Sequence, residues 1–366
     1  MIIDIIAGAR PNFMKIAPII NSIEKARQNG HAISYRLIHT GQHYDKKMSG
    51  DFFEQLGIPE PDVNLGAGGG SQAEQTAAIM VGYERELIKM PVDMVLVVGD
   101  VTSTMACSIV AKKLKIKVAH VEAGIRSFDL DMPEEINRMV TDSITDYFFT
   151  TSEFANHNLR LCNIPDERIF FVGNTMIDTL LKQRPLFIKP SFWNEFGLEV
   201  GKYLVMTLHR PANVDEDDKL TNLINEIIQN SRELPLIFPV HPRTAKILEN
   251  LGISHPRLHM IDPLGYLEFN YLVERAKGVI TDSGGVTEET TVMGVPCMTL
   301  RDSTERPETI TTGTNELLGT DPKAIKPAME KLFAGKWKGG TIPELWDGKT
   351  AERIVETLIR LSQNPK

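Results

Sequence analysis

The stretch Gly278–Pro296, GVITDSGGVTEETTVMGVP, joins an apolar run, a polar turn rich in glycine and a segment with helical composition. A strand, a turn and a helix in succession form the repeating unit of α/β proteins with parallel sheets. Backbone N–H groups at the start of the expected helix favour an anion at the Ser283–Gly285 turn. Two carboxylates, Glu288 and Glu289, follow one turn later, where they would repel an isolated phosphate. A nucleotide fits both features, because its phosphates accept from N–H groups and its ribose hydroxyls donate to a carboxylate.

Apolar runs that end in polar or glycine turns recur along the whole chain, as in MVLVVGD, KVAHVEAG, KYLVMTLHR and LPLIFPVH. Near-continuous runs of this kind indicate parallel strands covered by helices on both faces. The series restarts at Lys202 after an aromatic and proline-containing stretch. We therefore predict an α/β protein of two doubly wound domains that face each other across a cleft, with the boundary between Gly173 and Lys202. Helices are expected at Lys15–Asn29, Ser71–Met90, Thr102–Lys115, Pro133–Asp146 and Asp215–Leu234, with Ser71 and Glu74 forming a capping box at one helix start.

The composition of the 366 residues is that of a globular protein, and the length suits two domains. The formal net charge of −8 argues against nucleic acid as the main partner. No apolar run approaches the roughly 20 residues that a membrane span needs, and no N-terminal targeting segment is visible. The sequence therefore predicts a cytoplasmic protein without a membrane partner.

Ionisable residues follow several of the expected strands in the first half of the chain. Asp100 and Glu122 end strongly apolar runs, where a carboxylate is costly unless it is paired or used. Glu134 follows Pro133, so it either acts in the site or complements a helix dipole. Arg10 and Lys15, which are otherwise surface charges, can be aimed at one anion by a loop and the first helical turn.

In the second half, His209 ends an expected strand and faces the same cleft, so we interpret it as functional. His241 follows another strand and is left open between a structural and a functional role. The histidines and acids lack the spacing of known zinc or calcium ligand sets. No Gly-x-Gly-x-x-Gly follows a strand. We therefore expect neither a metal nor a nicotinamide cofactor.

Eight segments, in order over nearly the whole chain, carry a family resemblance: GARPNFMKIAP, TGQHYD, VVGDVTSTMA, HVEAGIRSFD, MPEEINR, TLHRPAN, TDSGGVTEE and LRDSTERPE. Together they resemble the non-hydrolysing UDP-N-acetylglucosamine (UDP-GlcNAc) 2-epimerases. The resemblance implies the GT-B arrangement of two Rossmann-like domains. It implies domains at 1–175 and 176–349, with a C-terminal helix at about 350–366 crossing back to the first domain. It also implies a homodimer.

The resemblance implies reversible inversion of C2 of UDP-GlcNAc to UDP-N-acetylmannosamine (UDP-ManNAc), which feeds ManNAc-derived surface polysaccharide synthesis. The route is anti elimination of UDP to a 2-acetamidoglucal, followed by re-addition of UDP. By resemblance, Asp100, Glu122 and Glu134 are the acid–base carboxylates. It also implies that His209 is catalytic and neutralises the departing UDP. The substrate-binding residues it implies are Arg10, Lys15, Arg306, Ser283, Gly284, Gly285, Glu289 and Phe269, the last at the uracil.

A regulatory second site is expected to be incomplete. Family members activated by a second UDP-GlcNAc molecule carry two glutamines near TGQHYD. Here Gln42 is present beside His43, but Asp45 stands at the second position. Gln42, His43 and His241 are candidates for a second site or the cleft. We expect a rate curve in UDP-GlcNAc that is close to hyperbolic.

Three alternatives stay open on the sequence. The first is a 2-epimerase acting on a modified UDP-amino sugar, such as a diacetamido-uronate or a 6-deoxy sugar. The second is a GT-B glycosyltransferase, which does not require three carboxylates around the sugar. The third is a UDP-sugar-binding protein without catalytic activity.

Overall fold

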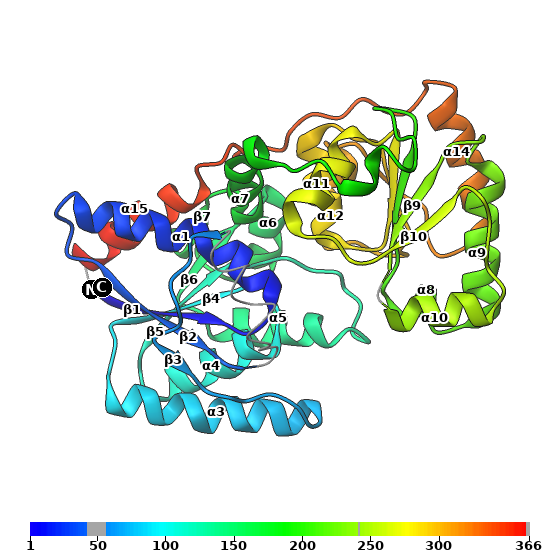
Figure 1. The fold of residues 1–366 in the computed structure, drawn as a ribbon. Coiled ribbons are helices and arrows are strands. Elements are labelled where there is room, and N and C mark those ends of the chain that lie inside the picture. The colour runs from blue at the N-terminus through cyan, green and yellow to red at the C-terminus, as the bar shows by residue number, and fades with distance from the viewer. Residues whose placement is uncertain (42–55, 241, 364–366) are drawn as a thin grey trace. The chain divides into compact units, whose positions relative to one another are not determined.

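The computed structural model describes residues 1–41, 56–240 and 242–363. The chain divides into two compact units. One unit comprises Met1–Thr179 with Glu344–Lys366, and the other comprises Leu180–Pro343. Both are built from a parallel sheet with helices on its two faces (Figure 1), so the predicted doubly wound α/β class is confirmed.

The first unit contains a seven-stranded sheet in the order β3-β2-β1-β4-β5-β6-β7. Chain order reverses between β1 and β4, which pair through Ile3 with Met94 and Ile5 with Leu96. In such sheets ligands bind beyond the carboxyl ends of the strands at this reversal. The strands are β1 Ile2–Ala7, β2 Ser34–His39, β3 Val63–Asn64, β4 Met94–Val98, β5 Lys117–Val121, β6 Tyr147–Thr150 and β7 Ile169–Phe171.

Helices cover both faces of this sheet. The final helix, α15, packs on α1, so the predicted return of the chain end to the first unit is confirmed (Figure 1). On the other face α4 packs between α3 and α5. The predicted capping box is present, because Ser71 accepts from the Glu74 N–H and Glu74 accepts from the Ser71 N–H. The helices are α1 Arg10–Gln28, α3 Gln72–Lys89, α4 Thr102–Lys113, α5 Pro133–Ile144, α6 Glu153–Leu161, α7 Thr175–Gln183 and α15 Thr350–Gln363.

The second unit repeats the plan with a six-stranded sheet in the order β10-β9-β8-β11-β12-β13. Its reversal lies between β8 and β11, so the residues after these two strands border the expected ligand crevice. The strands are β8 Leu204–Thr207, β9 Leu236–Pro239, β10 Leu258–Ile261, β11 Gly278–Thr281, β12 Cys297–Thr299 and β13 Asn315–Leu317. The helices are α8 Pro211–Val214, α9 Asp217–Asn230, α10 Pro242–Asn250, α11 Tyr266–Arg275, α12 Gly284–Met293, α13 Pro307–Thr311 and α14 Ile325–Phe333.

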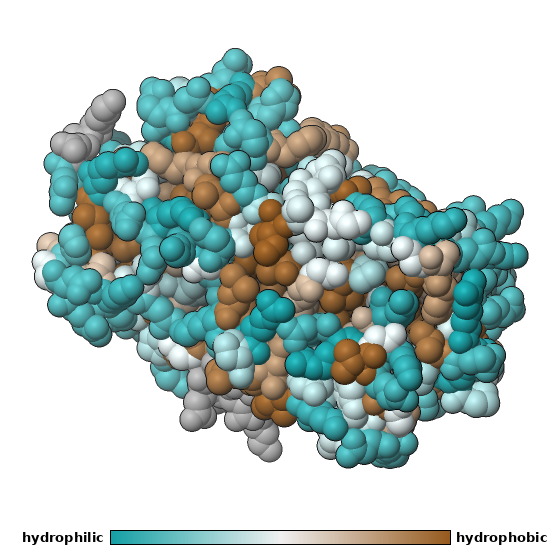
Figure 2. Space-filling view, turned by 90° about the horizontal axis from the view of Figure 1, so that it is seen from above, coloured by the Kyte–Doolittle hydropathy of each residue, from teal (hydrophilic) through white to brown (hydrophobic). Residues whose placement is uncertain are grey.

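The apolar strand residues are buried within each unit, as at Leu96 in β4 and Ile280 in β11. On the face shown in Figure 2, hydrophobic residues form small groups among hydrophilic ones. Within the described ranges no helix combines the length and the apolar composition needed to cross a bilayer.

Candidate active site

The loop after β1 is held against the end of β4 by one amide side chain. Asn12 Oδ1 accepts from the N–H groups of Gly8 and Ala9, at 3.1 and 2.9 Å, and its Nδ2 donates to the carbonyl oxygen of Val98 at 3.1 Å. An amide suits this position because it accepts and donates at once. The contacts fix the start of α1, whose first residue is Arg10.

Lys15 and Glu122 form a buried ion pair at the carboxyl edge of the first sheet. Lys15 Nζ lies 2.7 Å from Glu122 Oε2, and the two side chains are 13% and 2% exposed. Glu122 has a φ of 67°, a backbone region that residues with a side chain rarely adopt, and such strain concentrates at functional sites. A side chain at Gly99 would place its Cβ 3.2 Å from Lys15 Nζ, so a glycine here leaves space for the pair.

Asp100 follows Gly99 and is held in place by hydrogen bonds from two residues of α5. Arg138 Nε donates to Asp100 Oδ2 at 3.0 Å, and Asn137 Nδ2 donates to the Asp100 carbonyl oxygen at 2.8 Å. The Asp100 side chain keeps 28% of its surface exposed, whereas Arg138 is 4% exposed. Asp100 therefore has a fixed orientation and an accessible face, which a proton-transfer group needs.

The neighbouring acids Glu134 and Glu135 differ in their surroundings. Glu135 is buried, accepts from Ser127 N at 3.0 Å and Phe128 N at 3.2 Å, and pairs with Arg138. Its contacts hold the loop before α5. Glu134 is exposed in the first turn of α5, so its predicted acid–base role stays a prediction.

In the second unit a buried carboxylate organises the loop after β8. Asp282 accepts from the N–H groups of His209 and Arg210, at 3.0 and 2.9 Å, and from Asn213 Nδ2 at 3.1 Å. Burial alone would raise the pKa of Asp282, but the hydrogen bond and charge of His209, with the backbone N–H donors, lower it. The sequence analysis did not single out Asp282 within the polar turn. Its position directly after β11 is nevertheless one where ligand-binding residues are expected in such sheets.

Helix α12 begins at the predicted phosphate cradle, with Ser283 as its N-cap. A Cβ built on Gly285 would meet no atom within 4 Å, so this glycine leaves open space beside the helix start. A Cβ on Gly284 would lie 3.2 Å from Glu305 Oε1. Glu305 in turn pairs with Arg301 at 2.7 Å, which places a cation close to the helix N-terminus.

The two carboxylates that follow the cradle, Glu288 and Glu289, both have partners within the second unit. Glu288 pairs with Arg306, and both side chains are buried. Tyr266 Oη donates to Glu289 Oε1 at 2.7 Å. Burial, with the charge of Glu288, raises the pKa of Glu289 to about 7 against the hydrogen bond from Tyr266. The sequence did not identify Tyr266, which lies one turn before Phe269 in α11.

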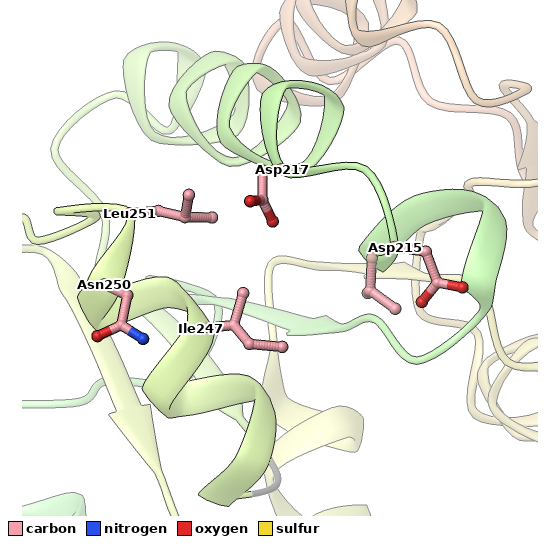
Figure 3. A pocket seen from close by; sticks show the side chains of 6 residues that line it. Asp215, Asp217, Ile247, Asn250 and Leu251 are labelled. Atoms are coloured by element: carbon pink, nitrogen blue, oxygen red, sulfur yellow. The ribbon is translucent and has the colours of Figure 1, made fainter.

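Phe269 is partly buried and packs on the core between α11, α12 and the sheet. Gln42, His43 and His241 lie outside the described residues. A separate cavity of about 340 Å³ opens beside α8 and α9 (Figure 3), and none of the predicted site residues line it. Its lining consists of Val214, Asp215, Asp217, Ile247, Asn250 and Leu251.

Known proteins resemble the chain over its whole length. A family model described as UDP-N-acetylglucosamine 2-epimerase matches residues 25–359. A UDP-N-acetylglucosamine 2-epimerase of Methanocaldococcus jannaschii is 41% identical, over 98% of this chain and 99% of the relative. A UDP-2,3-diacetamido-2,3-dideoxy-D-glucuronate 2-epimerase of Pseudomonas aeruginosa is 38% identical, over 97% and 99%. The crystal structure of the M. jannaschii UDP-GlcNAc 2-epimerase in complex with UDP-GlcNAc and UDP is similar at a TM-score of 0.87 and 41% identity, over 98% of this chain and 100% of that one.

Proposed function

Because the chain belongs to the UDP-N-acetylglucosamine 2-epimerase family, we propose that it interconverts UDP-GlcNAc and UDP-ManNAc by inverting C2 of the sugar. The observation that best supports this activity is the pair of carboxylates Asp100 and Glu122 at the ends of adjacent strands. Each is held by a cation, Arg138 or Lys15. Two fixed carboxylates supply the base and the acid that inversion at a C–H centre requires.

We propose an elimination followed by an addition. One carboxylate removes the C2 proton, the electron pair of the C–H bond forms the C1=C2 double bond, and the C1–O bond breaks to release UDP. UDP then adds again to C1 of the 2-acetamidoglucal, while a carboxylic acid delivers a proton to the opposite face of C2. The net reaction gains and loses no proton. Asp100 and Glu122 carry these steps, and Glu134 is a third candidate.

The second unit supplies the nucleotide site in this proposal. The N–H groups at Ser283, Gly284 and Gly285 bind the diphosphate, and His209 stabilises the charge that grows as UDP leaves. Glu289 accepts from the ribose hydroxyls. Phe269 contacts the uracil, and Arg306 holds the phosphates after its bond with Glu288 rearranges. That Arg10 and Lys15 neutralise the departing UDP stays a prediction.

The rival substrate is a diacetamido-uronate carried by UDP, because the P. aeruginosa relative bears that name at 38% identity. The two substrates differ at C3, which carries a hydroxyl or an acetamido group, and at C6, which carries an alcohol or a carboxylate. Purified protein should be given each UDP-sugar separately and the epimers separated by chromatography. We expect UDP-GlcNAc to reach an equilibrium mixture with UDP-ManNAc. Turnover confined to the uronate would reassign the substrate while keeping the reaction.

The wider role is also a proposal. UDP-ManNAc would be the substrate of another enzyme that builds ManNAc-derived surface polysaccharide. The protein described here would act as a homodimer and would need neither a nicotinamide cofactor nor a metal. Light scattering of the purified protein tests the oligomeric state, where a mass near twice 40.9 kDa is expected.

A further inference from the structure

The imidazole of His120, in β5, is enclosed between two hydrogen-bond acceptors. Its Nδ1 lies 2.7 Å from Asp142 Oδ1, and its Nε2 lies 2.8 Å from the carbonyl oxygen of Gly99. The ring is fully buried. A carbonyl oxygen and an ionised carboxylate only accept, so both ring nitrogens must donate. The ring therefore links Asp142 of α5 to the Gly99 carbonyl at the end of β4.

Asp142, in α5, has the contacts of an ionised carboxylate. Its Oδ2 accepts from Gly124 N at 3.1 Å and lies 2.7 Å from Arg126 Nη1. Burial would raise the pKa of Asp142, but the hydrogen bond and charge of His120, together with Arg126, lower it. The Asp142 carboxylate is thus contacted both by His120 in β5 and by Gly124 and Arg126 in the loop that follows β5.

These contacts end next to the two carboxylates proposed for proton transfer. Gly99, which accepts from His120, immediately precedes Asp100. Gly124, which donates to Asp142, is the second residue after Glu122. The same face of α5 also carries Arg138, one turn before Asp142, and Arg138 binds the Asp100 side chain directly.

We propose that His120 and Asp142 are positioning residues that fix the separation of Asp100 and Glu122 by tying the ends of β4 and β5 to α5. The proposal rests on the proposed epimerase function. His120 acts through the Gly99 carbonyl and the backbone of β5, and Asp142 through the Gly124 N–H. Displacing either carboxylate by about 1 Å costs on the order of 100-fold in rate, because proton transfer requires the acid and base at hydrogen-bond distance.

A purely structural ion pair in the same sheet offers a matched control. Asp4 in β1 is fully buried, accepts two hydrogen bonds from Arg36 at 2.8 Å each, and accepts from Tyr83 Oη at 2.9 Å. Its contacts lie along the sheet towards α3 and involve none of the proposed catalytic residues. Asp4→Asn therefore disturbs a comparable buried charge without touching the ends of β4 and β5.

The test compares kcat, KM and UDP affinity for the wild type, Asp142→Asn and Asp4→Asn. Both variants should unfold at lower urea concentration. Only Asp142→Asn should lower kcat, by roughly 10- to 100-fold, while KM and the Kd of UDP change less than about twofold. Equal kcat losses in both variants, or an unchanged kcat in Asp142→Asn, would overturn the positioning role.

A spectroscopic measurement covers the case in which Asp142→Asn does not fold. In wild-type protein labelled with ¹⁵N-histidine, both ring nitrogens of His120 should carry a proton, with the assignment made from the signals that disappear in His120→Gln. An unprotonated ring nitrogen on His120 would contradict the proposed hydrogen bonds from His120 to Asp142 and to the Gly99 carbonyl. This readout needs no substrate, so it separates failure of the pair from failure of the proposed epimerase reaction, which wild-type turnover of UDP-GlcNAc decides.

Discussion

His209 Nδ1 lies 2.7 Å from Asp282 Oδ1, and the histidine side chain is 61% exposed while the aspartate is fully buried. One ring nitrogen is therefore fixed by a buried carboxylate, and the rest of the ring projects to the surface of the unit. Such a pairing sets the orientation of an imidazole that acts on a bound group. In the proposed reaction that group is the diphosphate of UDP.

The difference in exposure predicts that substituting His209 mainly affects turnover, whereas substituting Asp282 mainly affects stability. His209→Ala should change the unfolding free energy little, because the side chain is largely exposed, but should lower kcat strongly. Asp282→Ala should destabilise the unit by a few kcal/mol, since it leaves several buried N–H donors unsatisfied. Urea unfolding with parallel kinetics checks both. A large loss of stability in His209→Ala with unchanged turnover would reverse the assignment.

The Lys15–Glu122 ion pair predicts non-additive stability. Lys15→Met leaves the Glu122 carboxylate buried without this cation and should cost about 3–5 kcal/mol. The double variant Lys15→Met/Glu122→Gln removes both charges and should recover part of the loss. A double-mutant cycle by urea unfolding measures the coupling. Additive effects would mean that the two groups do not stabilise each other.

Asp100 and Glu122 should matter for chemistry more than for nucleotide binding. Asp100→Asn and Glu122→Gln should each lower kcat by about 100-fold or more, the usual scale for an acid or base. The Kd of UDP, measured by calorimetry, should stay near the wild-type value. Glu330→Gln, an exposed position in α14, is the control and should be neutral. Loss of UDP affinity with normal turnover of bound substrate would assign the two acids to binding.

Much of this arrangement follows from sequence patterns with simple physical causes. Continuous apolar runs predict buried parallel strands, and the strand-end rule locates Asp100 and Glu122. The sequence placed Glu134 of α5 among the candidates, but it did not predict that the polar stripe Glu135, Arg138 and Asp142 is buried. They are buried because each reaches a loop at the edge of the sheet. Spacing along the chain does not show which way such a stripe faces.

Glu289 predicts a pH dependence of stability and binding. Burial and Glu288 raise its pKa from 4.5 to about 7. The folded state therefore prefers the protonated form, so its stabilising contribution is complete below about pH 4.5 and is lost as pH rises to about 7. Relative to Glu289→Gln, the wild type should lose stability across this window in urea unfolding.

Binding of UDP should show the complementary trend. Ribose hydroxyls donate best to an ionised carboxylate, so UDP affinity should rise as pH passes through about 7 and level off above it. UDP phosphate also titrates near pH 6, and comparison with Glu289→Gln removes that contribution. Identical pH slopes for the wild type and the variant would mean that Glu289 does not contact the ribose.

Incubation of the purified protein with UDP-GlcNAc in deuterated water, followed by proton NMR, tests the central claim most directly. Removal of the C2 proton and delivery of a solvent-derived one predict UDP-ManNAc that carries deuterium at C2, formed without added NAD or metal. The H2 signal of the UDP-GlcNAc pool should also decay as the reaction cycles back. UDP-ManNAc that retains the original proton at C2, or no epimer at all, would contradict the account.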